Sequence, residues 1–138
     1  MTLERMGGEH VTGLWGLAER SFEFAVAVMN IANDIPRTGK GWILARQLLR
    51  AGTSVGANVE EANNAFSDGE FAHSCNIARK EAAETRYWLK LARRTSLLAG
   101  DALEKLTREA DELARILATI VRETRQRLRK GKAEPGGL

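Results

Sequence analysis

The sequence predicts an all-α fold, an antiparallel up-down-up-down bundle of four helices in a single domain. Apolar residues recur at alternating steps of three and four along four long segments, which is the spacing of one buried helix face. Short polar or glycine-containing stretches separate these segments, as in bundles with short loops. The two prolines, Pro36 and Pro135, lie where a helix should already have ended. We expect the bundle to span residues 12–130, between a flexible leader (1–11) and a flexible tail (131–138).

The first helix is predicted to begin after Thr12, a suitable cap, and to end before Pro36. Two neighbouring apolar rows run along it, and together they are wider than one bundle needs to bury. The first row contains Leu14, Leu17, Ser21, Phe24, Val28, Ile31 and Ile35. The second row contains Trp15, Ala18, Phe22, Ala25, Met29 and Ala32. The additional row indicates a bundle that is a subunit of a larger assembly.

The second helix is predicted over residues 42–65, and it contains Gly52 and Gly56. A glycine inside a helix costs about 1 kcal/mol relative to alanine. We therefore expect another helix to approach closely at this glycine pair.

The third helix is predicted over residues 69–98, with Ser67 and Asp68 as capping residues. Gly100 should end this segment, and Asp101 should cap the fourth helix. The fourth helix has a regular heptad row, which contains Leu103, Leu106, Ala110, Leu113, Leu117, Ile120 and Thr124.

The middle of the chain carries a specific family pattern over two helices. It comprises Gln47-Leu48-Leu49-Arg50-Ala51, Ser54-Val55, Asn58-Val59-Glu60-Glu61-Ala62, Ser67, Glu70-Phe71, Ile77-Ala78 and residues 80–89. This pattern resembles the four-helix-bundle proteins encoded in intervening sequences of bacterial large-subunit (23S) ribosomal RNA genes. Family members often have the sequence Asn-Ile-Ala-Glu-Gly where this chain has Asn-Val-Glu-Glu-Ala at residues 58–62. The resemblance therefore does not define where the second helix ends.

The resemblance implies a ring-shaped homopentamer of bundles. A related protein, the accessory variability protein of diversity-generating retroelements, is a basic pentamer that binds nucleic acid and a reverse transcriptase. The biochemical role of the family itself is unassigned, and the resemblance implies no catalytic residues.

A set of polar residues is predicted to meet inside the bundle if the second and third helices form a hairpin about residues 66–68. Arg50 would then lie opposite Glu84 and within reach of Glu81. We interpret the set as a structural network that fixes helix register, with a ligand or catalytic site as the alternative. Its members are Arg50, Ser54, Asn58, Glu61, Glu81 and Glu84.

The sequence contains no enzyme signature. Glu70 and His73 form one Glu-x-x-His step, but di-metal bundles need a second such step. Cys75 has no histidine placed to activate it, and we interpret it as a core residue. We therefore expect no catalytic activity, no metal and no cofactor, with a metal-dependent bundle enzyme as the least favoured alternative.

Basic residues are concentrated in two segments, although the net charge is only +3. One cluster ends the third helix and contains Arg86, Lys90, Arg93 and Arg94. The other ends the fourth helix and contains Arg122, Arg125, Arg127, Arg129, Lys130 and Lys132. This clustering favours an oligomer that binds RNA or DNA, with a protein as a further candidate partner. The alternative is a protein-binding helical adaptor whose basic ends are solvated surface.

A cytoplasmic protein is expected. A single cysteine favours a reducing compartment. The N-terminal segment has no signal-peptide pattern, and no apolar stretch is long enough to span a membrane.

Overall fold

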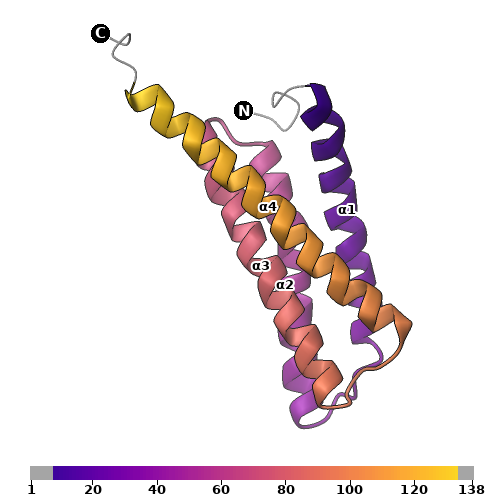
Figure 1. Ribbon diagram of the computed structural model, residues 1–138. Helices are drawn as coiled ribbons and strands as arrows, with labels where there is room; N and C mark the ends of the chain where they lie inside the picture. The colour runs from indigo at the N-terminus through magenta and orange to yellow at the C-terminus, as the bar shows by residue number, and fades with distance from the viewer. Residues whose placement is uncertain (1–7, 134–138) are drawn as a thin grey trace.

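A computed structural model describes residues 8–133, with side chains described for residues 16–132. These residues form four helices and no strand (Figure 1). The helices are α1 (Gly8–Ala32), α2 (Lys40–Asn63), α3 (Asp68–Arg94) and α4 (Asp101–Ala133). No helix within this part of the chain is long and apolar enough to cross a membrane.

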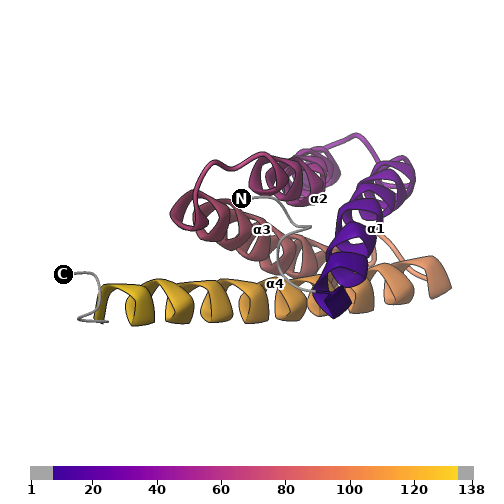
Figure 2. The ribbon, with the colours of Figure 1, turned by 90° about the horizontal axis from the view of Figure 1, so that it is seen from above.

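The four helices lie around a common core in chain order. Each helix packs against its neighbour in sequence, and α1 also touches α4 to close the arrangement (Figure 2). The core is built from the predicted apolar rows, including Phe71 of α3 and Leu113 of α4. Arg20 of α1 adds an ion pair across the contact with α4, where its Nη2 lies 2.7 Å from Glu109 Oε1.

The glycine pair of α2 lies against α1, which confirms the expected close approach. A Cβ atom on Gly52 would lie 2.6 Å from Val28 Cγ1, and one on Gly56 would lie 3.2 Å from the carbonyl oxygen of Ser21. Both distances are shorter than an ordinary van der Waals contact. The two glycines therefore set the spacing between α1 and α2.

The second apolar row of α1 is only partly covered within the single chain. Phe22 is 64% exposed and Met29 is 55% exposed, whereas Ala32 is buried. Val28 and Phe24 of the first row are buried. The side chain of Trp15 lies outside the described residues.

Ser67 caps α3 as predicted. Its Oγ accepts a hydrogen bond from the backbone N–H of Glu70, and the Glu70 carboxylate accepts one from the backbone N–H of Phe66. The bond to Ser67 satisfies one of the N–H groups that a helix start leaves without partners, and the bond from Phe66 ties the preceding residue to the first turn of α3.

The helix ends differ from the predicted ones at several points. α1 begins at Gly8 rather than after Thr12, α2 ends at Asn63, and α4 continues to Ala133, into the predicted tail. The rest of the predicted leader and tail, residues 1–7 and 134–138, lies outside the described residues.

The end of α3 also differs, because the helix stops at Arg94 instead of continuing to Leu98. Ser96 has a φ of 60°, in the left-handed region that ends helices. The backbone N–H groups of Leu97 and Leu98 both donate to the carbonyl of Ala92. This turn directs Leu98 into the core, where it is buried.

Candidate functional site

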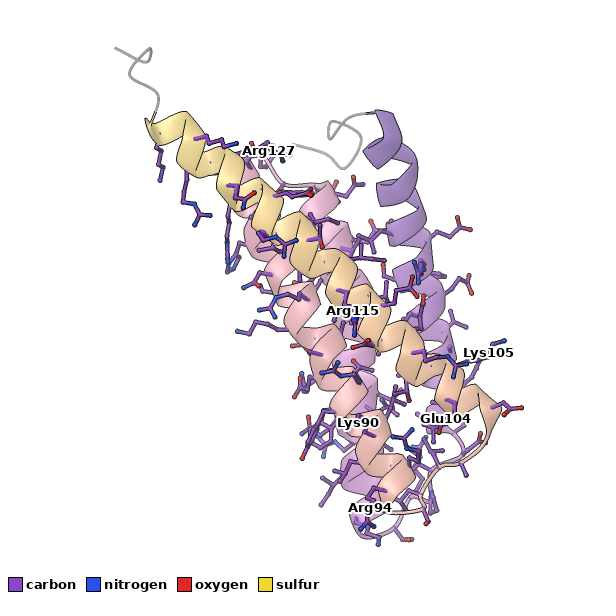
Figure 3. The ribbon with its side chains drawn as sticks, in the orientation of Figure 1. Lys90, Arg94, Glu104, Lys105, Arg115 and Arg127 are labelled. Carbon is purple, nitrogen blue, oxygen red and sulfur yellow. The ribbon has the colours of Figure 1, made fainter. Side chains whose placement is uncertain are left out.

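The two predicted basic clusters lie at different ends of the molecule. Lys90 and Arg94 lie near the end of α3, and Arg127 lies near the far end of α4 (Figure 3). The two clusters differ in how far nearby carboxylates compensate their charge.

At the end of α3, two of the four cations are paired with acids of α4. Arg93 Nη1 lies 2.9 Å from Glu104 Oε2, and Arg86 forms an ion pair with Asp111. Asp111 also pairs with Arg115 of its own helix at 3.0 Å. Lys90 and Arg94 have no ion pair among the described residues. This cluster is therefore partly neutralised.

The cluster at the end of α4 is not neutralised in this way. Within residues 16–132, none of its members pairs with a carboxylate, and Arg127 only donates a 3.5 Å hydrogen bond to Thr124 Oγ1. All members are exposed, namely Arg122, Arg125, Arg127, Arg129, Lys130 and Lys132. The six cations of this cluster thus lack the compensating carboxylates that two cations at the end of α3 have.

Three of these arginines share a surface hollow with a residue that sequence reasoning missed. Arg122, Arg125 and Arg129 line the hollow together with Arg79 of α3. The available signal was the spacing of Arg79, Arg86 and Arg93, which follow one another at seven-residue intervals and so share a helix face.

The predicted polar network forms only in part. Arg50 Nη2 lies 2.7 Å from Glu84 Oε2 and Arg50 Nη1 lies 3.2 Å from Glu81 Oε2, in the pairing expected for a hairpin. Ser54 and Asn58 instead donate to backbone carbonyls of their own helix, those of Arg50 and Ser54. Glu61 is exposed.

The prediction that this network is buried is wrong. The side chains of Arg50, Glu81 and Glu84 are 46%, 20% and 37% exposed. The interior positions between α2 and α3 are occupied by small and apolar residues such as Ala51, Val55 and Ala82. The charged side chains consequently lie at the edge of the contact, where solvent reaches them.

The electrostatics of this trio follow from its geometry. The hydrogen bond from Arg50 lowers the pKa of the Glu84 carboxyl. Partial burial raises the pKa of Glu81, against the opposing effect of Arg50. An arginine shared by two carboxylates links α2 to α3 and provides no free acid–base pair.

The described residues contain no cluster of three or more potential metal ligands. His73, on the Glu70–His73 step, is exposed. Cys75 is buried, and desolvation raises the pKa of its thiol to about 12. A thiol in that state is a poor nucleophile at neutral pH.

Comparison with known proteins identifies close relatives of the chain. Residues 16–119 match the family model described as 23S rRNA-intervening sequence protein. A crystal structure of a protein of unknown function from the S23 ribosomal protein family of Bacteroides thetaiotaomicron is similar, with 37% sequence identity and a TM-score of 0.71. The alignment covers 76% of this chain and 97% of that one. Comparison with functionally curated proteins finds no match.

Proposed function

The chain belongs to the family of 23S rRNA-intervening sequence proteins, and from this premise we propose that it is a non-enzymatic, oligomeric helical protein that binds RNA or DNA. The observation that carries the proposal is the uncompensated cluster at the end of α4, residues 122–132. Six basic side chains lie within it, and Glu123 is the one acid between them. A cytoplasmic location is part of the proposal and suits a chain whose single cysteine is a buried free thiol.

Electrostatics explains why such a cluster suits a nucleic acid. Exposed cations that already face a carboxylate gain little from a second anion, because their field is compensated. Cations without such a partner release counterions from a phosphate backbone when they bind to it. This difference favours the α4 cluster over the cluster at the end of α3 as the main contact surface.

The assembly is the second component of the proposal. We propose an antiparallel up-down-up-down bundle that forms a homopentameric ring, as the family resemblance implies. Along α3 and α4, the ion pairs Arg93–Glu104 and Arg86–Asp111 run in opposite residue order, which supports the antiparallel arrangement. The exposed Phe22 and Met29 support burial of α1 against another subunit. A ring would repeat the α4 cluster around one face and so increase its affinity for a polyanion.

Fluorescence anisotropy with labelled single-stranded RNA and duplex DNA tests nucleic-acid binding. We expect binding that weakens steeply between 50 and 200 mM salt. Replacing Arg127 and Lys130 together by glutamine should reduce affinity and flatten the salt dependence. The matched control replaces Lys40 and Arg46, which are exposed on α2 and form no ion pair among the described residues, and should bind like the wild type.

A protein-binding adaptor is the second candidate function. It is favoured by Phe66, which is 94% exposed in the turn between α2 and α3, and by the exposed Ile43 of α2. An intact oligomer without affinity for RNA or DNA at 50 mM salt would contradict the first proposal and favour the adaptor.

A further inference from the structure

The α3–α4 contact contains a repeating ladder of charges. Arg93, Arg86 and Arg79 follow at seven-residue intervals on α3 and face α4. The first two meet Glu104 and Asp111, which are also seven residues apart. The next position on α4 in this series is Ala118. Arg79 is therefore the one arginine of this series that has no acid at the corresponding position of α4.

Arg79 is held in place by a neutral neighbour instead. Its Nε donates a 2.9 Å hydrogen bond to Asn76 Oδ1, one turn earlier on α3. Arg79 is half-buried, and it has no ion pair among the described residues. The hydrogen bond through Nε restrains the guanidinium group and leaves its two terminal nitrogens available to a ligand.

The hollow beside Ala118 brings further arginines to the same place. It has a volume of about 360 Å³. Its lining residues are Asn76, Arg79, Ala118, Val121, Arg122, Arg125 and Arg129. Ala118 and the three arginines of α4 follow one another at steps of three and four residues, so they share one helix face. Four arginines and no carboxylate thus line a single hollow.

This arrangement matches a phosphate group. A guanidinium group presents N–H donors in a planar fork that fits two oxygens of a phosphate, and it remains charged at any ordinary pH. Ala118 provides room at the position where the neighbouring rungs of the ladder have an acid. Clustered cations without acids are electrostatically unfavourable in the free protein, so an anion at the hollow relieves their repulsion.

We propose that the hollow between α3 and α4 binds a backbone phosphate of the nucleic acid, with Arg79 as its central ligand. The choice of nucleic acid as the source of the phosphate rests on the proposed function. The site differs from the rest of the α4 cluster because it requires a residue of α3 and the absence of an acid at position 118.

Completing the ladder tests the site. Ala118→Glu places a carboxylate opposite Arg79, as Glu104 lies opposite Arg93. We expect about a tenfold loss of affinity for a labelled single-stranded RNA, because a charge-assisted contact is lost. The slope of log affinity against log salt should become shallower by about 0.7 for the lost phosphate contact. Arg79→Gln should have the same effect by removing the ligand itself.

Two control variants isolate the position of the charge. Ala118→Gln has nearly the same size without the charge and should retain most of the affinity. Ala102→Glu adds the same charge at an exposed position on α4, about 24 Å away along the helix. It should leave the salt slope unchanged. Thermal unfolding followed by circular dichroism verifies that each variant is folded. In the case that Ala118→Glu does not fold, the affinity and salt slope of Arg79→Gln test the site.

The outcomes separate this inference from the proposed function. Wild-type protein that does not bind RNA or DNA overturns both. Wild-type protein that binds RNA, while Arg79→Gln and folded Ala118→Glu bind equally well with the same slope, overturns the phosphate site alone. Competition provides a further arm. Inorganic phosphate should displace RNA only weakly. If poly-glutamate displaces RNA as effectively as unlabelled RNA does, the surface binds acidic ligands in general, and the assignment of a nucleic-acid phosphate site is overturned.

Discussion

Gly52 of α2 lies directly against Val28 of α1, where a Cβ atom would be 2.6 Å from Cγ1 and 2.7 Å from Cγ2. Val28 is fully buried and its branched side chain has little rotational freedom. The contact therefore leaves no room for even one additional methyl group, and it determines how closely α1 and α2 approach.

Gly52→Ala should destabilise the protein by up to about 2 kcal/mol. Overpacking costs about 1–3 kcal/mol, and the gain in helix propensity of about 1 kcal/mol offsets part of that cost. Chemical denaturation followed by circular dichroism measures the change. Gly16→Ala is the matched control, because nothing lies within 4 Å of the added Cβ and the same propensity gain should stabilise α1.

A second substitution tests the cause. Val28→Ala removes both methyl carbons that Gly52→Ala would strike, so Gly52→Ala should cost much less in that background. Equal stabilisation by Gly52→Ala and Gly16→Ala in the otherwise wild-type chain would show that α1 can move away without cost.

Arg50→Gln should cost about 1 kcal/mol of unfolding free energy at pH 7, an amount limited by the solvent exposure of all three side chains. The substitution leaves Glu81 and Glu84 close together without their shared cation. Denaturant titrations at pH 7 and pH 4 measure the cost at both values. Arg46→Gln, one turn earlier and without an ion pair among the described residues, should cost little at either pH.

The pH dependence follows from the direction of each pKa shift. Arg50 lowers the pKa of Glu84, so the stabilisation from Glu84 is present above its unfolded pKa and is lost as pH falls through its folded pKa. The raised pKa of Glu81 acts in the opposite direction. Without Arg50, both carboxyls favour protonation, and the cost of Arg50→Gln should therefore decrease from pH 7 to pH 4. A cost that grows on acidification would contradict this account.

The helices and the glycine contact could be predicted from the sequence because they depend on local spacing. Heptad rows specify a buried face, and two glycines in a helix require a close neighbour. The end of α3 could not be predicted in this way, because Ser96 adopts a left-handed conformation that serine rarely takes. Its reason is tertiary, since the turn places Leu98 in the core.

Only the part of the candidate site that lies on α4 could be predicted from the sequence. Arg122, Arg125 and Arg129 stand out in the sequence as a dense cluster, whereas Arg79 is marked only by its seven-residue spacing from Arg86 and Arg93. Its position beside them depends on the register between α3 and α4. That register cannot be worked out from the sequence, because the segment that connects the two helices has an irregular conformation. The same limit explains why Arg50 was expected to be buried. Its pairing with Glu84 followed from hairpin register, but its depth depends on how α2 is rotated about its axis.

Cys75 should be unreactive in the folded protein. It is buried, and desolvation raises the pKa of its thiol to about 12, so almost no thiolate is present at pH 8. A thiol-reactive dye at pH 8 should label the native protein very slowly and the protein in denaturant rapidly. Stoichiometric labelling of native protein within seconds would show that α3 opens locally or that the thiol is accessible.

Phe22→Glu and Met29→Glu should each reduce the mass of the assembly. These side chains are the most exposed of the described members of the second apolar row of α1, and a charge there would have to be desolvated at a subunit contact. Light scattering coupled to size-exclusion chromatography gives the mass. Asn30→Glu adds the same charge to another exposed position on α1 and should leave the mass unchanged. If the wild type is monomeric, the ring is excluded. If Phe22→Glu and Met29→Glu keep the wild-type oligomer mass, the subunit contact lies on another face, and the repeated basic surface would then have to be built around a different axis.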